Sequence, residues 1–287
     1  MIYVDILSII IVLGSVGNIF SIVIWKYGKR SKTTNCKTYM WSLAVNDLFI
    51  LLVIGTEYAI YVNGIELRVK HDIICKFVCF FGMFSPQLSA WITVLIAMER
   101  MLYVIAPLQM FQTNAKRRSI IAIVSIILFS FSLNVNVLFT ASVNVYSENS
   151  TVSSCVLNAM DDYTSKILNA VSYGIFTFLL PLLIITVSNV ITLVTICTRK
   201  KIAQGGTRQE RNIRNITRVV ISISIMHCIS TFPYATFMYS QYSLSFASSQ
   251  FYQFIITSYF LNSGINFVLY CLFGDYFRQD LKETIMS

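Results

Sequence analysis

Charged residues are scarce in this sequence, and their scarcity indicates the class of protein. Only 12% of the 287 residues are charged, whereas a soluble globular domain usually carries about 25%. A soluble core of this size needs a polar surface, and the chain has too few charges to build one. Hydrophobic residues make up 56% of the chain, and the mean hydropathy is +0.68. The composition excludes an ordinary soluble enzyme and favours a polytopic membrane protein.

Several other features are absent as well. An intramembrane enzyme needs clustered acidic or histidine ligands, or a Ser/His pair, and the two histidines, His71 and His227, have no visible partner. A transporter needs a continuous polar route, broken helices or internal repeats; the chain has a polar layer only in the inner half and no repeat, so a seven-helix transporter stays a less favoured alternative. No basic stretch precedes the first apolar run, so no cleavable signal peptide is expected. Seven cysteines are too few for a disulfide scaffold.

What the chain does contain is a series of long apolar segments. A helix that crosses a bilayer needs about 20 apolar residues. The fold class predicted is an all-α membrane protein, in which a seven-transmembrane bundle fills residues 1–287 as a single domain. The spans are predicted at 6–25, 39–62, 73–104, 118–141, 166–198, 213–240 and 251–272. Residues 273–283 alternate aromatic and charged side chains at helical spacing, which predicts a short amphipathic eighth helix on the inner leaflet.

The loops differ in charge, and this difference predicts the orientation. Basic residues gather in the first, third and fifth connections and in the tail, whereas the second connection has only Arg68 and Lys70. The positive-inside rule then puts the amino terminus outside and the tail in the cytoplasm. The net charge of +9 is explained in this way, without a nucleic-acid partner. Asn149 begins an N-glycosylation acceptor on the predicted outer side.

Polar residues inside the spans need a reason, because they are costly in lipid. Given the helical rise, Asp47, Ser89, Asn262, Asn266 and Asn18 lie at similar depth in four different spans. Carboxylate, hydroxyl and amide oxygens together suit a small hard cation or ordered water. The alternative is a hydrogen-bonded layer that only specifies helix packing.

Cysteines and charges mark the two ends of the third span. Cys75 falls at the outer end, where it has Cys155 of the fourth connection as a disulfide candidate, with Cys79 one turn below as a competitor. The alternative is that Cys75 and Cys155 are both free thiols. Glu99 and Arg100 fall at the inner end, where they form either an interface anchor or a latch released by a cytoplasmic partner.

These residues together resemble the rhodopsin-like (class A) G-protein-coupled receptors, in a divergent form similar to invertebrate neuropeptide receptors. The resemblance covers nearly the whole chain. The motifs that carry it are Gly17-Asn18, Leu43-Ala44-Val45-Asn46-Asp47, the pair Cys75 and Cys155, Glu99-Arg100-Met101, Pro181 and Pro233, Asn266-Phe267-Val268-Leu269-Tyr270, and the helix from Phe273 to Lys282.

The resemblance implies roles for these residues. No cofactor is expected apart from an allosteric sodium ion, with Asp47 and Ser89 as metal ligands in a pocket that also holds Asn18, Asn262 and Asn266.

The resemblance further implies a multi-pass plasma-membrane receptor with membrane lipid, an extracellular ligand and a heterotrimeric G protein as partners. Arg100 would meet the G protein after the sixth span swings outward at Pro233, and Tyr270 would move inward. Cys75 and Cys155 would form a disulfide.

Departures from the family pattern predict unusual switching. Met101 replaces a tyrosine, Phe267 replaces the proline of the seventh span, and Thr231 stands where the family has a toggle tryptophan. Ile213 replaces the acid that often pairs with the arginine of the third span, so the inactive latch is expected to rest on Glu99. Because these switch residues are missing, we expect loosely controlled switching or constitutive activity. The alternative is a receptor-like protein without ligand-dependent signalling.

The predicted ligand is a short, basic peptide. The resemblance to amine receptors fails because Gly82 stands where they have an aspartate, and the resemblance to opsins fails because Phe260 stands where they have a lysine. About five outer residues at the amino terminus are too few to capture a large hormone. Glu57 is expected to pair with a ligand cation. The residues predicted to line the pocket are Glu57, Tyr61, Gly82, Tyr173, Tyr234, Phe237 and Phe260.

Overall fold

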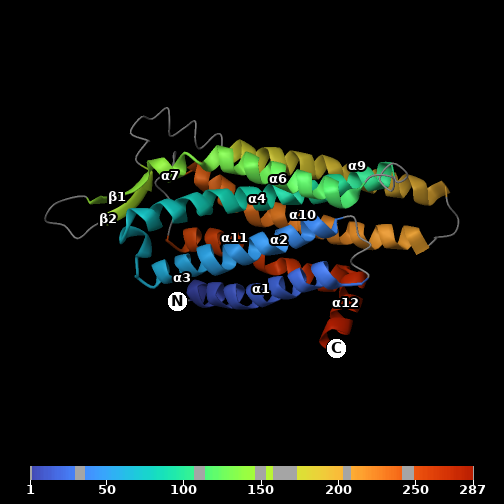
Figure 1. Cartoon of the computed structure of the whole chain (residues 1–287), viewed down its shortest axis with the longest axis horizontal. Coiled ribbons are helices and arrows are strands. Elements are labelled where there is room, and N and C mark those ends of the chain that lie inside the picture. Colours follow the sequence, from blue (N-terminus) through green and yellow to red (C-terminus); the bar gives the residue numbers. More distant parts are fainter. Residues whose placement is uncertain are drawn as a thin grey trace.

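A computed structural model of the chain describes residues 2–29, 36–106, 114–145, 153–157, 173–202, 208–240 and 249–286. Within these ranges, seven helical segments are long and apolar enough to cross a membrane. They lie along one another in an elongated bundle (Figure 1). The predicted seven-span bundle is therefore confirmed.

The spans are built from the following elements. The first is α1 (Ile2–Tyr27), and the second combines α2 (Lys37–Phe49), a π-helical segment η2 (Ile50–Gly55) and α3 (Thr56–Val62). The third is α4 (Asp72–Ile105), and the fourth joins α6 (Ala115–Asn134) to α7 (Val137–Thr140). The fifth joins the π-helical segment η5 (Gly174–Leu179) to α9 (Leu180–Ile202), and the last two are α10 (Arg208–Ser240) and α11 (Ser249–Phe273). A short 3₁₀ turn, η3 (Leu67–Val69), follows the second span.

The π-helical segments in the second and fifth spans were not predicted. Such segments insert an extra residue into a helix, which leaves a carbonyl without its usual partner and re-aims the following side chains. In the fifth span, the indole Nε1 of Trp91 on α4 donates to the free carbonyl of Phe176 at 2.9 Å. A tertiary contact thus stabilises a local irregularity that hydropathy alone does not reveal.

Helix α4 is the central helix of the bundle, because it contacts α2, α6, α9 and α10. Helix α1 packs instead against α2 and α11 at the edge. It approaches α11 closely at Gly14, where a Cβ atom would lie 2.7 Å from the Cα atom of Gly264. Small residues at a helix contact allow two membrane helices to pack closely, and a larger residue at Gly14 would force the two backbones apart.

The outer faces of α1, α6 and α9 carry large apolar side chains that nothing in the bundle covers. An exposed apolar belt of this kind marks a surface that faces lipid. Representative exposed residues are Val12, Leu13, Leu128, Leu183 and Val194.

The amphipathic eighth helix is also confirmed, as α12 (Asp275–Met286). It begins directly after Gly274 and turns away from the direction of α11 (Figure 1). Phe277 is its anchor, with its ring 5.5 Å from Trp25 of α1 and 5.1 Å from Tyr270 of α11. We call the end of the bundle that carries α12 the inner end.

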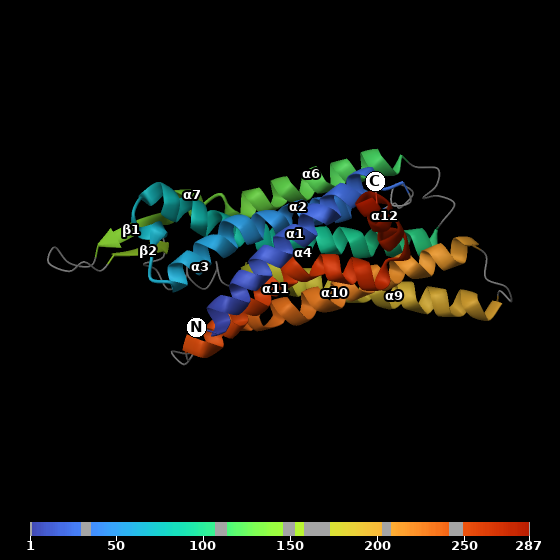
Figure 2. The same ribbon diagram turned by 90° about the horizontal axis from the view of Figure 1, so that it is seen from below.

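A β-hairpin departs from the all-α prediction. Strands β1 (Ala141–Val145) and β2 (Ser153–Leu157) pair antiparallel, with Val143 opposite Cys155. The hairpin lies at the opposite end of the bundle from α12 (Figure 2), which we call the outer end. Its strands are only five residues long, with sequences ASVNV and SSCVL, and segments this short give a weak strand signal in the sequence even though they contain valine.

Candidate functional site

Asp47 on α2 is fully buried at mid-bundle, among polar side chains from α4 and α11. The amide nitrogen of Asn266 donates to its Oδ2 atom at 2.7 Å. The hydroxyls of Ser89 and Ser263 lie within interaction range of the same carboxylate, although neither makes a hydrogen bond of normal geometry. The structure thus places Asp47, Ser89 and Asn266 together and adds Ser263. Sequence reasoning missed Ser263, although its position three residues before Asn266 puts both on one helix face.

The other two residues of the predicted polar layer face neighbouring groups. Asn18 donates to the backbone carbonyl of Ser263 at 2.9 Å, which places it beside the cluster. The amide nitrogen of Asn262 lies 3.4 Å from Nδ1 of His227. His227 therefore has a partner across the α10–α11 interface, which its isolated position in the sequence did not reveal.

The donor set around Asp47 fits a small cation. Four buried oxygens have no hydrogen-bond partner among the described residues: Asp47 Oδ1, Asn18 Oδ1, Ser89 Oγ and Ser263 Oγ. Leaving a buried polar atom unpaired costs about 1–3 kcal/mol, and more for a charged group. Carboxylate, hydroxyl and amide oxygens are the ligands of hard cations. The residues present therefore suit the sodium ion that the resemblance implies.

Arg100 is buried near the inner end of α4, with only 3% of its surface exposed. Its Nε atom donates to the sulfur of Cys36 at 3.2 Å, and its guanidinium lies 5.6 Å from the ring centre of Tyr103. Burial raises the pKa of the Cys36 thiol, an effect that the nearby guanidinium opposes. At neutral pH the thiol therefore stays protonated, and it accepts from Arg100 as a neutral sulfur.

Glu99 does not act as the latch for Arg100, which corrects the expectation from the sequence. Its carboxylate instead accepts from Arg118 at the start of α6, at 2.6 Å. Consecutive residues of a helix project about 100° apart, so neighbours in the sequence do not face each other. Glu99 therefore joins α4 to α6, and its carboxylate is not the group that holds Arg100.

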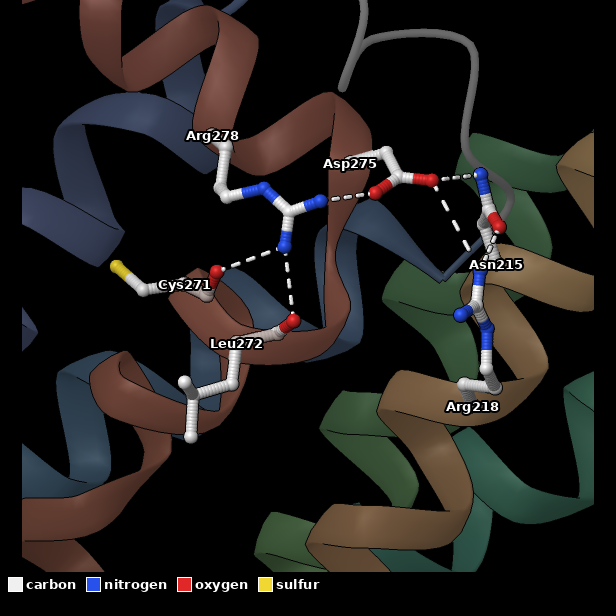
Figure 3. A network of polar contacts seen from close by, with 6 residues as sticks. All are labelled: Asn215, Arg218, Cys271, Leu272, Asp275 and Arg278. Carbon is white, nitrogen blue, oxygen red and sulfur yellow. Dashed lines mark hydrogen bonds and ion pairs between the residues drawn. The ribbon is translucent and has the colours of Figure 1, made fainter.

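A different polar network closes the inner end, between α10 and α12 (Figure 3). The amide nitrogen of Asn215 on α10 donates to Oδ2 of Asp275, the first residue of α12. Arg218, one turn further along α10, donates to Oδ1 of Asn215 and lies 3.8 Å from Asp275 Oδ2. We call Asn215, Arg218 and Asp275 the inner clasp. Nothing in the sequence motifs indicated it, because its members come from two helices far apart in the chain.

Arg278 fixes the α12 side of the inner clasp. Its guanidinium pairs with Oδ1 of Asp275 and also donates to the carbonyls of Cys271 and Leu272, at 3.0 and 2.8 Å. These carbonyls belong to the last turn of α11, where unpaired carbonyls commonly accept from an arginine. Figure 3 shows Arg278 between the end of α11 and Asp275. Arg278 of the same helix therefore fixes the Asp275 carboxylate in the position where it accepts from Asn215 on α10.

Tyr270 lies beneath the inner clasp and is fully buried. Its ring meets the edge of Trp25 at 5.4 Å. Tyr270, Asn215 and Asp275 line the same cavity. Pro233 lies far from this cavity, in the outer part of α10. A helix interrupted by proline bends more easily there, so a bend at Pro233 would move the inner end of α10, which carries Asn215.

At the outer end, Glu57 already has a cation, which changes the role expected for it. Arg68 binds its carboxylate in a bidentate manner, at 2.9 and 2.6 Å. The same guanidinium lies 4.9 Å from the ring centre of Tyr61. Arg68 comes from the turn η3, whose position over α3 could not be read from the sequence. Glu57 is therefore not open to a ligand cation unless Arg68 moves.

Phe260 does not face a pocket in this structure. Only 2% of its surface is exposed, and it belongs to an apolar cluster with Leu7 of α1, Ile50 of η2 and Tyr58 of α3. The sequence placed it at the right depth but on the wrong face of α11. Its role is to pack the first, second and seventh spans together.

The remaining predicted pocket residues have varied surroundings. A Cβ atom at Gly82 would meet no described residue within 4 Å, so the packing of the described helices does not fill this position of α4. Tyr173 is half-buried beside η5, and Tyr61 is 38% exposed. Tyr234 and Phe237 lie on α10, but their side chains fall outside the described residues.

A disulfide joins Cys75 at the start of α4 to Cys155 of β2. Asp72 supports the same contact, because its carboxylate accepts from the backbone nitrogen of Val143 on β1 at 2.8 Å. The hairpin is thus attached to the outer end of the central helix. Asn149, the predicted glycosylation site, lies outside the described residues.

Comparisons with known proteins agree with this arrangement. The profile of the family described as 7 transmembrane receptor (rhodopsin family) matches residues 17–270. The galanin receptor 2b of Danio rerio is 23% identical over 286 residues, which cover 96% of this chain and 73% of that receptor. The matched region contains α2, α4, α9 and α10 in full, and it ends at Tyr270.

Proposed function

Because this chain belongs to the rhodopsin family of seven-transmembrane receptors, we propose that it binds a peptide at its outer end and activates a heterotrimeric G protein at its inner end. The observation that carries this proposal is Arg100. A buried guanidinium near the inner end of the central helix, held among the described residues by a neutral thiol and a ring, is placed for release toward a cytoplasmic partner.

The proposal requires a defined orientation in the plasma membrane. The basic first, third and fifth connections belong to the inner end, and the hairpin belongs to the outer end. The positive-inside rule supports a cytoplasmic inner end and an extracellular amino terminus. In this orientation the Cys75–Cys155 disulfide is in the oxidising compartment where such bonds persist, and Asn149 is accessible for glycosylation.

A peptide is the ligand class that the observations favour. The similar receptor from Danio rerio is named for galanin, a peptide. No described residue lies within 4 Å of a Cβ atom at Gly82, so the described helices leave this position of α4 unfilled. A basic group of that peptide would compete with Arg68 for Glu57, so binding would exchange an internal ion pair for one with the ligand. Such an exchange favours ligands with a well-placed guanidinium or amine.

The buried cluster around Asp47 supports sodium as an allosteric modulator. The Asp47 carboxylate has no cationic partner among the described residues, and a bound sodium ion would neutralise its charge. Asp47, Ser89 and Asn266 would hold it, with Asn18 and Ser263 beside them. An ion that holds α2, α4 and α11 together favours the closed bundle, because it binds that state better than one in which the helices have moved apart.

The inner clasp is the contact that opening must break. Outward movement of the inner end of α10 carries Asn215 and Arg218 away from Asp275 on α12. Since Glu99 is paired with Arg118 and Ile213 supplies no acid, the clasp substitutes for the latch that this chain lacks at Arg100.

A cell assay tests the proposed function. Cells that express the chain at a measured surface level are treated with a neuropeptide library that includes galanin, and dissociation of a panel of G proteins is recorded. We expect at least one peptide to trigger dissociation of one G-protein class. Silence for every peptide and every G protein at confirmed surface expression would favour a receptor-like protein without ligand-dependent signalling.

A further inference from the structure

A third sulfur lies beside the disulfide at the outer end. The Sγ atom of Cys79 is 3.5 Å from the Sγ atom of Cys155, which is bonded to Cys75. All three sulfurs lie within 4.8 Å of one another. We propose that Cys155 has two alternative partners on α4, and that the Cys75–Cys155 bond exchanges with a Cys79–Cys155 bond. This inference concerns the covalent structure and does not depend on the proposed signalling function.

Helix geometry makes both pairings available. Cys75 and Cys79 are separated by four residues, so they lie one above the other on a single face of α4. Cys155 faces both of them from β2. Phe80, Val137 and Ala141 form a buried apolar cluster around the three cysteines and hold the hairpin root against α4. The sulfurs are therefore kept close together by packing, whichever bond is formed.

The exchange needs no oxidant or reductant. The Cys79 thiolate attacks Sγ of Cys155, the Cys79–Cys155 bond forms, and the Cys75–Cys155 bond breaks. Cys75 leaves as a thiolate and takes up a proton, which replaces the proton that Cys79 lost. One disulfide and one thiol are present before and after the step, so the electrons balance.

The exchange requires only a small movement of the hairpin. The Cys79 and Cys155 sulfurs are 3.5 Å apart, whereas two bonded sulfurs are about 2 Å apart. Forming the second bond closes the difference and pulls β2 toward Cys79, one helical turn further along α4. Strand pairing transmits this pull to Val143 of β1, whose backbone nitrogen donates to Asp72.

The sequence provides a direct way to distinguish the bonds, because Lys76 lies between the two cysteines. Trypsin cleavage after Lys76 separates Cys75 in peptide 71–76 from Cys79 in peptide 77–100, and Cys155 falls in peptide 119–166. The full-length chain is purified in lipid nanodiscs and equilibrated in a glutathione redox buffer. Free thiols are blocked with N-ethylmaleimide, N-linked glycans are removed, and the unreduced tryptic peptides are identified by mass spectrometry.

We expect both cross-linked pairs in the natural chain, 71–76 with 119–166 and 77–100 with 119–166. The Cys75→Ser variant should contain only the second pair, and the Cys79→Ser variant only the first. Cys197→Ser, which removes an exposed thiol on α9, is the matched control and should leave both pairs in place.

Two results would overturn the proposal. One is a natural chain in which peptide 77–100 is never linked to 119–166 at any glutathione ratio. The other is a Cys75→Ser chain that reaches the cell surface with Cys79 and Cys155 both free. If Cys75→Ser does not fold, the mapping of the natural chain alone decides the question.

Discussion

The buried carboxylates of the spans differ in what neutralises them. Glu57 and Glu99 each have an arginine, contributed by η3 and α6 respectively. Within the part of the chain that the structure describes, Asp47 has neutral partners, and the amide of Asn266 is its direct hydrogen-bond donor. A buried charge is costly unless it is paired, so Asp47 is the acidic group in this set with a reason to bind a cation.

Replacing Asp47 with asparagine tests the cation site. We expect added sodium to lower agonist affinity or basal activity of the natural receptor, because the ion favours the closed bundle. Asp47→Asn should abolish that dependence, since the amide cannot neutralise a cation. The measurement is a titration with NaCl against N-methyl-D-glucamine chloride at constant ionic strength. An equal sodium response in both proteins would exclude Asp47 as a ligand.

Replacing Arg118 with methionine tests the pair at Glu99. Methionine keeps the apolar stem but leaves the Glu99 carboxylate, which is 4% exposed, without its cation. We expect the variant to lose about 1–3 kcal/mol of stability, seen as a lower midpoint of thermal unfolding in detergent. Arg117→Met removes an exposed neighbouring charge and is the matched control. Equal midpoints for the two variants would show that the pair contributes nothing.

Sequence reasoning succeeded at single residues where helix geometry alone decides position. Asp47, Ser89 and Asn266 could be placed at one depth because each lies on a regular helix with a fixed rise. The partners of Glu57 and Glu99 could not be predicted in this way. Arg68 comes from an irregular turn and Arg118 from another helix, so their approach depends on packing that no local pattern records.

At the scale of elements, the inner clasp predicts higher basal activity when it is removed. Asn215→Ala removes the hydrogen bond between α10 and α12, and Asp275→Asn removes the charge that faces Arg218. A partly exposed network of this kind contributes about 1 kcal/mol, which corresponds to roughly a fivefold shift toward the open state. We expect about that increase in ligand-independent G-protein dissociation at equal surface expression.

The control for the clasp is Lys282→Gln, which alters an exposed charge on α12 outside the clasp. Hydrogen exchange at the inner turns of α10 gives a second measurement that needs no G protein. If exchange is faster in the clasp variants but basal activity is unchanged, the clasp stabilises the inner end of α10 without controlling signalling. Unchanged exchange and unchanged activity would contradict its proposed role.

The elements themselves could be predicted unevenly. The seven spans and α12 were recognised because long apolar runs and helical amphipathicity are local properties of the chain. The π-helical segments η2 and η5 were not recognised, because hydropathy does not record such irregularities. The Trp91 indole that stabilises η5 comes from another helix, whereas Thr56 donates to Leu51 within the span that contains η2. The hairpin was missed for a similar reason: its strands are only five residues long, and the disulfide and Asp72 that attach it to α4 are contacts between distant parts of the chain.

At the scale of the whole molecule, the distribution of basic residues predicts how the bundle lies in the membrane. An epitope tag at the amino terminus should be stained on intact cells, whereas a tag after residue 287 should require permeabilisation. Asn149→Gln should also remove a glycan and increase electrophoretic mobility. Staining of the carboxy-terminal tag on intact cells would contradict the orientation on which the inner and outer assignments depend.

The central claim is that the inner end binds a G protein through Arg100. The most direct measurement is complex formation between the purified chain in nanodiscs and a panel of nucleotide-free heterotrimers. The account predicts a complex with at least one heterotrimer that GTPγS dissociates and that Arg100→Ala weakens at least tenfold, while the variant keeps its thermal midpoint. A folded natural chain that binds no heterotrimer, or an Arg100→Ala variant that binds equally well, would contradict it.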